Sequence, residues 1–395
     1  MSSLATKAAT SSLPSVPAQI GDLRAIARRA LKRMYLPDRG MFAFCLRRGR
    51  NGDVLEGVSP RYSAIALIGL AEEDESVASD VLGGADIQTL CSRLLDDVHQ
   101  VENVGDVALT LWAALALRHS EAGKAHDQLR ELRPWECACP TVELAWALTA
   151  FSISETLASS ETFASAEALA PDPAFLDSAP ASQVARRLLG SFLPASELFP
   201  HWPSDAGASW IRDHVCCYAD LVYPIQALSH YYRCSGDEEA ITVAKRCAER
   251  MCSLQGEAGQ WWWHYDVRSG RVLEGYPVYA IHQDAMGPMA LLDLQEASGV
   301  GHGEAIQRSL DWLTDPPELD ATLIDPEAGV VWRKAARHEP GKLVRSVQAI
   351  ASRAHPALRV PGLDSLFRPG FVDWESRPYH FGWLLYAWAP RRFAS

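Results

Sequence analysis

The chain has 395 residues, of which 48% are hydrophobic and 22% charged, and its formal net charge is −12. This composition is ordinary for a globular protein with a large core. The negative charge argues against nucleic acid as a partner, because phosphates would be repelled and no arm rich in Lys or Arg overcomes this. No stretch approaches the roughly 20 apolar residues that a membrane span needs, so none is expected.

The cysteines and the start of the chain predict the compartment. Nine cysteines are spaced too irregularly for a secreted disulfide scaffold. None forms the paired C-x-x-C pattern of a structural zinc site, so we expect free thiols and predict neither a metal nor a cofactor. Residues 1–19 lack the apolar segment of a signal peptide and are predicted to be a disordered lead. A cytoplasmic location is expected, and the oligomeric state stays open.

Apolar residues recur with helical spacing along most of the chain. A helix is predicted from Ile20 to Met34, followed by a short strand at Phe42 to Leu46 and a turn at Asn51 to Asp53, which together indicate a small β-hairpin. Such a long series of helical stretches favours helical hairpins stacked as an array or a closed ring. The stretches after the hairpin are 62–71, 87–99, 107–119, 142–152, 181–192, 215–232, 238–254, 285–297, 305–313 and 343–351.

Two further segments bear on the domain organisation. Residues 154–180 are rich in Ser, Ala, Glu and Pro, which favours a flexible insertion containing a short helix. Residues 373–388 are dense in aromatic side chains that need burial, which favours a last helix that closes the ring. Because the helical pattern is the same on both sides of the insertion, we expect 20–395 to form one all-α domain, an α/α toroid with irregular aromatic loops.

One motif resembles a known superfamily. Leu254-Gln255 and Gly259-Gln260-Trp261 follow a helical stretch. They resemble the Gln, Gly, Trp motif of the terpenoid cyclase and protein prenyltransferase toroids, where the motif ties one helix to the next. The expected ring with an aromatic-lined cavity also resembles the six-hairpin glycosidases, polysaccharide lyases and sugar epimerases. The Asp-x-Asp-Asp proton-donor motif of cyclases is absent from the sequence.

Candidate catalytic residues stand just before two of the predicted helices. His282 and Asp284 could protonate and deprotonate a substrate, with aromatic burial raising the carboxyl pKa. The alternative is that Asp284 caps the helix and His282 binds a backbone carbonyl. Asp213 and Asp220 are seven residues apart and are expected on nearly one helix face, so either could be a second carboxylate. Asp213 could instead be a cap paired with Arg212.

Other carboxylates could likewise be either catalytic groups or helix caps. Glycoside hydrolysis usually needs two carboxyls, roughly 5 to 10 Å apart. Asp106 opens an apolar helix and is most simply interpreted as a cap, and Glu143 fits the third position of a capping arrangement. Asp266 and Glu274 are further candidates for the second carboxyl.

Candidate substrate-binding residues are aromatic or charged side chains in predicted loops, where binding residues concentrate. Sugar rings stack on tryptophan, and aromatic faces also stabilise carbocations. Arg61 could hold a carboxylate or phosphate beside Tyr62, or could pair with Glu56 instead. The remaining candidates are Trp202, Trp210, His214, Trp261, Trp262, Trp263, His264, Glu274 and Tyr279.

Three functions are compatible with these patterns. The favoured one is a carbohydrate-active enzyme, a hydrolase, lyase or epimerase, that uses acid and base side chains on a small-molecule or oligosaccharide ligand. The second is an isoprenoid cyclase-like enzyme, which the missing aspartate motif weakens. The third is a non-catalytic toroid that binds a partner or serves as a scaffold.

Overall fold

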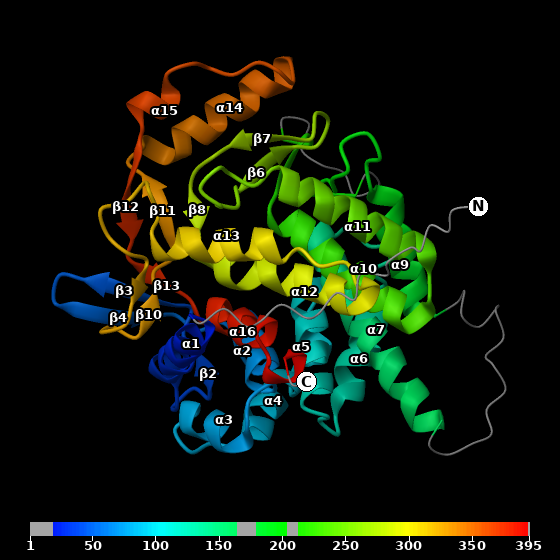
Figure 1. The fold of residues 1–395 in the computed structure, drawn as a ribbon. Coiled ribbons are helices and arrows are strands. Elements are labelled where there is room, and N and C mark those ends of the chain that lie inside the picture. Colours follow the sequence, from blue (N-terminus) through cyan, green and yellow to red (C-terminus); the bar gives the residue numbers. More distant parts are fainter. Residues whose placement is uncertain (1–18, 164–178, 204–211, 394–395) are drawn as a thin grey trace, which may run out of the picture.

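The computed structural model describes residues 19–163, 179–203 and 212–393. Its centre is a ring of helices, each packed on the next, that the last helix closes against the first (Figure 1). Most residues of these inner helices are buried around the whole circumference, as expected for helices enclosed by other helices. In ring order they are α2 (Pro60–Leu70), α5 (Val104–Ala116), α7 (Thr141–Phe163), α10 (Ala219–Ser235), α12 (Gly287–Ser298) and α16 (Pro378–Ala387).

A second layer of helices packs outside this ring. These helices are amphipathic: in α1, for example, Leu23, Ile26 and Ala30 are buried while the charged residues of the opposite face reach the surface. Alternating inner and outer helices make an α/α toroid, so the predicted fold class is confirmed. The outer helices are α1 (Ile20–Met34), α4 (Ile87–Leu95), α6 (Ala122–Glu131), α9 (Pro180–Ser191), α11 (Glu238–Ser253) and α13 (Gly303–Thr314).

Two glycines let the ring close. A Cβ atom on Gly69 of α2 would lie 2.2 Å from the carbonyl oxygen of Gly382 of α16. A Cβ atom on Gly382 would lie 2.4 Å from the carbonyl oxygen of Ile65. The backbones of α2 and α16 therefore approach as closely as only glycine permits. This contact makes α16 the ring-closing last helix that the aromatic C-terminal segment predicts.

Short strands occupy the connections between helices. The predicted hairpin is confirmed as β3 (Cys45–Gly49) and β4 (Gly52–Glu56), which β13 (Glu375–Ser376) extends to three strands. The strands in the later connections were not predicted, because two to five residues are too few for an alternating pattern. They form the sheets β5 (Val215–Cys217), β6 (His264–Asp266), β7 (Arg271–Glu274); β8 (Val278–Tyr279), β11 (Lys334–Arg337), β12 (Pro369–Asp373); and β9 (Ile324–Asp325), β10 (Val330–Val331). A further pair, β1 (Tyr35–Leu36) and β2 (Met41–Phe42), precedes the hairpin.

Some predicted helix limits were wrong. The stretch 215–232 begins as strand β5, which pairs with β6, and α10 starts only at Ala219. Asp213 and Asp220 therefore do not share a helix face. Helix α7 runs to Phe163, through the first part of the predicted insertion 154–180. The rest of that insertion, 164–178, and the predicted lead up to residue 18 lie outside the described residues.

Shorter helices complete the connections. None of α3, α6 and α15 was predicted, since each has too few apolar residues to show a period. The π-helix His282–Met286 leads directly into α12. The remaining elements are α3 (Glu75–Val81), α14 (Leu343–Ala354), α15 (Leu363–Leu366) and the 3-10 turns Val98–Gln100, Pro340–Lys342 and Pro390–Arg392.

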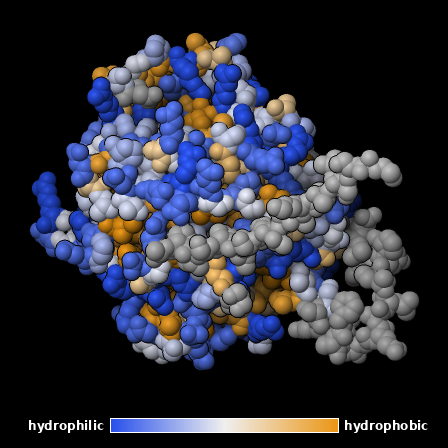
Figure 2. All heavy atoms as spheres, viewed as in Figure 1, coloured by the Kyte–Doolittle hydropathy of each residue, from blue (hydrophilic) through white to orange (hydrophobic). Residues whose placement is uncertain are grey.

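The surface and the Gln-Gly-Trp motif agree with the expected architecture. Among the helices described, none is both long and apolar enough to cross a membrane. The face drawn in Figure 2 is mostly hydrophilic, with separate hydrophobic patches. The side-chain amide of Gln255 donates to the carbonyl oxygens of Gly259 and Ala305 at 2.8 and 2.9 Å, which ties the end of α11 to α13. The motif is thus structural here.

Candidate active site

The first turns of the inner helices bring polar side chains together at one end of the ring. Arg61 of α2 donates to Asp106 and to Asn103 at the start of α5, at 2.5 and 2.8 Å. The Asn103 amide in turn donates to Glu143 of α7 at 3.1 Å. This network joins three neighbouring helices, so the corresponding end of the toroid carries a continuous polar rim.

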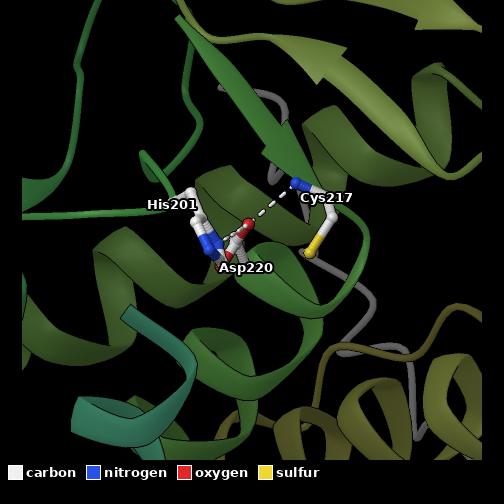
Figure 3. Close-up of side chains that lie close together, drawn as sticks. All are labelled: His201, Cys217 and Asp220. Carbon is white, nitrogen blue, oxygen red and sulfur yellow. Dashed lines mark hydrogen bonds and ion pairs between the residues drawn. The ribbon is translucent and has the colours of Figure 1, made fainter. Parts of the chain in front are cut away.

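At the next helix of the rim, an imidazole is held by a buried carboxylate (Figure 3). His201 Nδ1 lies 3.0 Å from Asp220 Oδ1, and the amide of Cys217 donates to Asp220 Oδ2 at 2.7 Å. The Asp220 side chain is 0% exposed, whereas 44% of the His201 side chain is exposed. The hydrogen bond to Asp220 raises the pKa of His201 above its ordinary value. His201 can therefore hold a proton that it presents to a ligand.

His201 opens onto one of two adjoining cavities. The first, of about 390 Å³, is lined by His201, Trp202, Arg212, Val215, Cys216, Cys217, Trp263, His264 and Arg345. The second, of about 420 Å³, is lined by Trp263, Glu274, Pro277, Tyr279, Arg333, Lys334, Ala336, Arg337, Glu339, Lys342, Arg345, Phe371 and Asp373. We call them the His201 cavity and the Lys342 cavity. Trp263 and Arg345 line both, so the two cavities meet at these side chains.

A buried polar group supports the shared wall. Nη2 of Arg345 lies 3.3 Å from His264 Nε2, and its Nε lies 4.0 Å from Glu274 Oε2. His264 Nδ1 lies 3.5 Å from the same carboxylate oxygen. Burial, and then the nearby positive charge of Arg345, lower the pKa of His264 well below its ordinary value. A neutral His264 therefore accepts a hydrogen bond from Arg345 and fixes the guanidinium over the ring of Trp263.

A second histidine–aspartate pair lies behind the cavities. His380 Nε2 is 2.7 Å from Asp284 Oδ1, and both side chains are buried. Asp284 lies inside the π-helix His282–Met286, so the alternative interpretation of Asp284 as the cap of α12 was wrong. π-Helical turns inside helices are frequent at functional sites. Asp284, a candidate from the sequence, thus orients the imidazole of His380.

His282 is packed among the rings of Tyr218, Trp263 and Tyr279, with centroid distances of 4.4, 6.0 and 5.2 Å. Burial, and then His380, lower the pKa of His282 to about 3. The imidazole is therefore neutral throughout the physiological pH range. Since Trp263 and Tyr279 line the Lys342 cavity, His282 lies directly behind its aromatic wall.

Tyrosines and arginines fill the part of the rim between α16 and α2. The ring of Tyr62 lies 4.6 Å from that of Tyr379, and Arg377 donates to the Tyr62 hydroxyl at 2.8 Å. Arg377 and Arg333 both bind Glu375, at 2.5 and 2.9 Å. The predicted ligand-contact residue Tyr62 is therefore part of an ordered rim.

Of the sequence-predicted site residues that the structure describes, only Trp202, Trp263, His264, Glu274 and Tyr279 line either cavity. Asp213 lies 3.3 Å from Arg353 and 3.6 Å from His214 Nδ1, and His214 bonds Ser352 on the side of α14. Trp261 is fully buried against Tyr218, and Trp262 packs on Tyr276. Trp210 lies outside the described residues. Burial explains the placement of His214 and Trp261, because a loop position in the sequence does not reveal which face of the loop packs inward.

Two alternatives for the rim were also wrong. Asn103, not Asp106, caps α5, because its side chain accepts the amide of Asp106 at 2.9 Å. Arg61 pairs with Asp106, whereas Glu56 pairs with Arg47. Arg61 therefore has a carboxylate of this chain as its partner and is less free to hold a ligand anion than the sequence suggested.

The sequence analysis missed His201, Arg212 and Arg345 as cavity residues. The signal for His201 was its place beside Trp202 between Pro200 and Pro203, a polar-aromatic loop like the ones that were considered. The pairing of His201 with Asp220 joins residues nineteen positions apart and needs the fold to be known.

One group of described side chains has converging metal-ligand atoms. The ligand atoms of His201, Cys217 and Asp220 all lie within 4.8 Å of one another. Histidine, cysteine and aspartate are zinc ligands. However, both Asp220 oxygens already accept hydrogen bonds, and burial followed by the charge of Asp220 raises the pKa of Cys217 well above its ordinary value. The Asp220 carboxylate is thus already held by His201 and by the Cys217 amide.

Comparison with known proteins identifies the fold. No family model and no curated protein sequence matches the chain. A cellobiose 2-epimerase from Bacillus thermoamylovorans B4167 matches with a TM-score of 0.60 and 10% identity, over 94% of this chain and 99% of that one. An unsaturated glucuronyl hydrolase specific for heparin matches with a TM-score of 0.58 and 13% identity, over 95% and 96%.

A sugar epimerase from a ruminal bacterium matches with a TM-score of 0.56 and 11% identity, over 94% of this chain and 99% of that one. The chain has the α/α-toroid fold of these enzymes. The superfamily resemblance inferred from the sequence is thereby confirmed for the fold. At such low identities function has to be argued from the site itself.

Proposed function

We propose that this protein is a carbohydrate-active enzyme that moves a proton to or from a sugar with the imidazole of His201. The observation that carries the proposal is the His201–Asp220 pair at the edge of an aromatic cavity. Asp220 is buried and fixes the orientation of a half-exposed imidazole, the arrangement by which carboxylates orient catalytic histidines. Trp202 and Trp263 line the same cavity and offer flat faces on which a sugar ring can stack.

The pKa values of two imidazoles near the cavities are shifted in opposite directions. The pKa of His201 is raised by Asp220, whereas the pKa of His282 is lowered to about 3 by burial. A base with so low a pKa does not take a proton from carbon at neutral pH, and His282 lies behind the wall formed by Trp263 and Tyr279. We therefore assign the proton transfer to His201, which lines a cavity, with Asp220 as its positioning group.

The carboxylates that line the cavities are held by other groups. Asp373 lies 3.1 Å from Lys334 Nζ, and Glu339 accepts the amide of Val344 at 2.5 Å. Glu274 lies beside His264 and Arg345. Hydrolysis by two carboxyl groups needs both to be available to the glycosidic bond. We therefore favour proton transfer at a sugar carbon, as in epimerisation or elimination, over hydrolysis.

The side chains that line the cavities also argue against the cyclase and scaffold functions. A cyclase needs an apolar cavity for an isoprenoid, but the Lys342 cavity is lined by five cationic and three acidic side chains. A scaffold protein has no need to hold a half-exposed imidazole against a buried carboxylate. Similarity in fold to two sugar epimerases and a glucuronyl hydrolase supports the sugar-directed function by analogy.

The test is turnover of a broad sugar panel by the purified chain and by three variants. His201→Gln and Asp220→Asn are expected to lower kcat/KM by about a hundredfold or more, the usual contribution of a general acid or base. The control is His99→Gln, which replaces an exposed histidine of the turn Val98–Gln100 and is expected to retain full activity. The proposal is refuted if no sugar is converted, or if the His201 and Asp220 variants are as active as the control.

A further inference from the structure

The two cavities are basic although the chain is acidic. Their described lining holds Arg212, Arg333, Lys334, Arg337, Lys342 and Arg345 against the carboxylates Glu274, Glu339 and Asp373. The described lining of the His201 cavity contains two arginines and no carboxylate. The whole chain, by contrast, carries a formal charge of −12. A local excess of positive charge in an acidic protein indicates a site that selects for negative charge.

Part of this charge is already neutralised inside the protein. Lys334 lies 3.1 Å from Asp373, and Arg333 lies 2.9 Å from Glu375. Arg345 stands where the cavities meet, while Arg212 lines the His201 cavity and Lys342 the other. Among the described residues, neither Arg212 nor Lys342 has a carboxylate within 4.0 Å of its side-chain nitrogens.

Arg345 is the centre of this group. It lines both cavities, its side chain is only 18% exposed, and its nearest described carboxylate, Glu274, is 4.0 Å away. His264 and the face of Trp263 hold the guanidinium in place, at 3.3 Å from the imidazole nitrogen and 5.4 Å from the ring centroid. A guanidinium fixed in this way can bind a carboxylate or phosphate with two parallel hydrogen bonds.

Two like charges, Arg212 and Arg345, also line the same cavity. After burial, the nearby Arg345 is the largest cause that lowers the pKa of Arg212. Two cations on the wall of one cavity repel each other, and a bound anion relieves that repulsion. Trp263 contacts Tyr279 and lines the same cavity as the basic side chains. A sugar ring stacked on Trp263 therefore has its substituents close to those basic side chains.

We infer that the substrate is an anionic sugar, a uronate or a sugar phosphate, whose negative group binds Arg345 with Arg212 and Lys342 on either side. This inference rests on the proposed function, since it assigns the substrate class of the same site. It makes Arg345 a specificity-determining residue, whereas His201 and Asp220 serve the proton transfer.

The experiment compares binding of D-glucose, D-glucuronate, glucose 6-phosphate and inorganic phosphate by titration calorimetry. At least one charged sugar is expected to bind about tenfold or more tightly than glucose, the order that a charge-assisted hydrogen bond contributes. Whether glucuronate or the phosphate ester binds more tightly identifies the source of the charge. Arg345→Gln is expected to abolish the preference.

Two further variants keep the test independent of a folding defect in Arg345→Gln. Lys342→Gln changes an exposed side chain and is expected to weaken the charged sugar severalfold while leaving glucose unaffected. Arg353→Gln is the matched control, since Arg353 is on the same helix α14, pairs with Asp213 and lines neither cavity. It is expected to bind every probe as the wild type does.

The outcomes separate this inference from the proposed function. If glucose binds as tightly as both charged sugars, or if Arg345→Gln and Arg353→Gln behave alike, the anionic-sugar inference is wrong and the proposed function stands. If inorganic phosphate binds as tightly as the charged sugars, the site recognises the anion without the sugar, and the inference is wrong. If no member of the sugar panel is turned over, the proposed function itself fails.

Discussion

His201 and Asp220 form an imidazole–carboxylate pair in which the carboxylate is buried and the imidazole is not. The Nδ1 atom of His201 lies 3.0 Å from Oδ1 of Asp220, and the backbone amide of Cys217 holds the other oxygen. The pair links the loop before β5 to the first turn of α10. Because the pair lies at the edge of the His201 cavity, the pH dependence of activity reports the protonation of His201.

The first prediction concerns the pH dependence of catalysis. Because Asp220 raises the pKa of His201, protonated His201 persists to higher pH than a free histidine, and activity that needs this proton declines as the pH rises through the raised pKa. Asp220→Asn removes the negative charge, so this alkaline limb moves to lower pH. A kcat/KM profile of both proteins measures the shift, and coincident alkaline limbs would contradict the role of Asp220.

The second prediction concerns stability in acid. His282 has a pKa of about 3 in the folded protein, against an ordinary value of 6.5, so the unfolded chain binds the proton more readily. Stability from this group is complete above pH 6.5 and is lost as the pH falls toward 3, with a slope of up to about 1.4 kcal/mol per pH unit. The slope applies to one titrating group.

His282→Gln removes this group, and denaturant unfolding between pH 7 and pH 4 compares the variant with the wild type. The variant is expected to be less stable at pH 7 because it replaces a packed ring, but to lose less stability on acidification. An unchanged pH slope in the variant would show that His282 does not titrate as described.

The third prediction concerns metal. Since both oxygens of Asp220 already accept hydrogen bonds from protein atoms, we expect zinc to leave the thermal midpoint unchanged. Activity is likewise expected to survive treatment with a chelator. A zinc-dependent rise of the midpoint that a chelator reverses, and that Cys217→Ser abolishes, would establish a metal site and overturn this prediction.

The fourth prediction concerns the closure of the ring. Gly382→Ala places a methyl group 2.4 Å from the carbonyl oxygen of Ile65, so α16 and α2 must separate, at a cost of about 1–3 kcal/mol. Gly190→Ala is the control. Gly190 is in α9, an added Cβ there meets nothing within 4 Å, and alanine in a helix stabilises by about 0.5–1 kcal/mol over glycine.

Urea unfolding of the two variants measures both effects. The free energy of unfolding should fall in Gly382→Ala and rise slightly in Gly190→Ala. Equal stability of the two would mean that α16 does not pack on α2 as closely as described.

The toroid could be predicted because its helices carry their signal locally. The apolar spacing from Ile20 to Met34 gives the limits of α1 directly, and the density of aromatic residues in 373–388 requires a buried closing helix. Strand β5 could not be predicted, since Val215–Cys217 continues an apolar stretch and only its partner β6 distinguishes strand from helix.

Candidate site residues could be predicted together only where they are close in the sequence. His282 and Asp284 were found because they are two residues apart, yet the partner of Asp284 proved to be His380, on the last inner helix. Asp220 was found without His201 for the same reason. Arg345 gave no signal, because nothing in the sequence of an amphipathic helix tells which charged residue faces a cavity.

The central claim is that the imidazole of His201 transfers a proton at a carbon atom of a sugar. Its most direct test is incubation of the sugar panel with the protein in D₂O, followed by proton NMR of the sugar C–H signals. The account predicts that one sugar loses a C–H signal to deuterium, or is converted to a product labelled at that carbon, with His99→Gln active and His201→Gln inactive. Turnover without deuterium at carbon, or exchange that persists undiminished in His201→Gln, would contradict it.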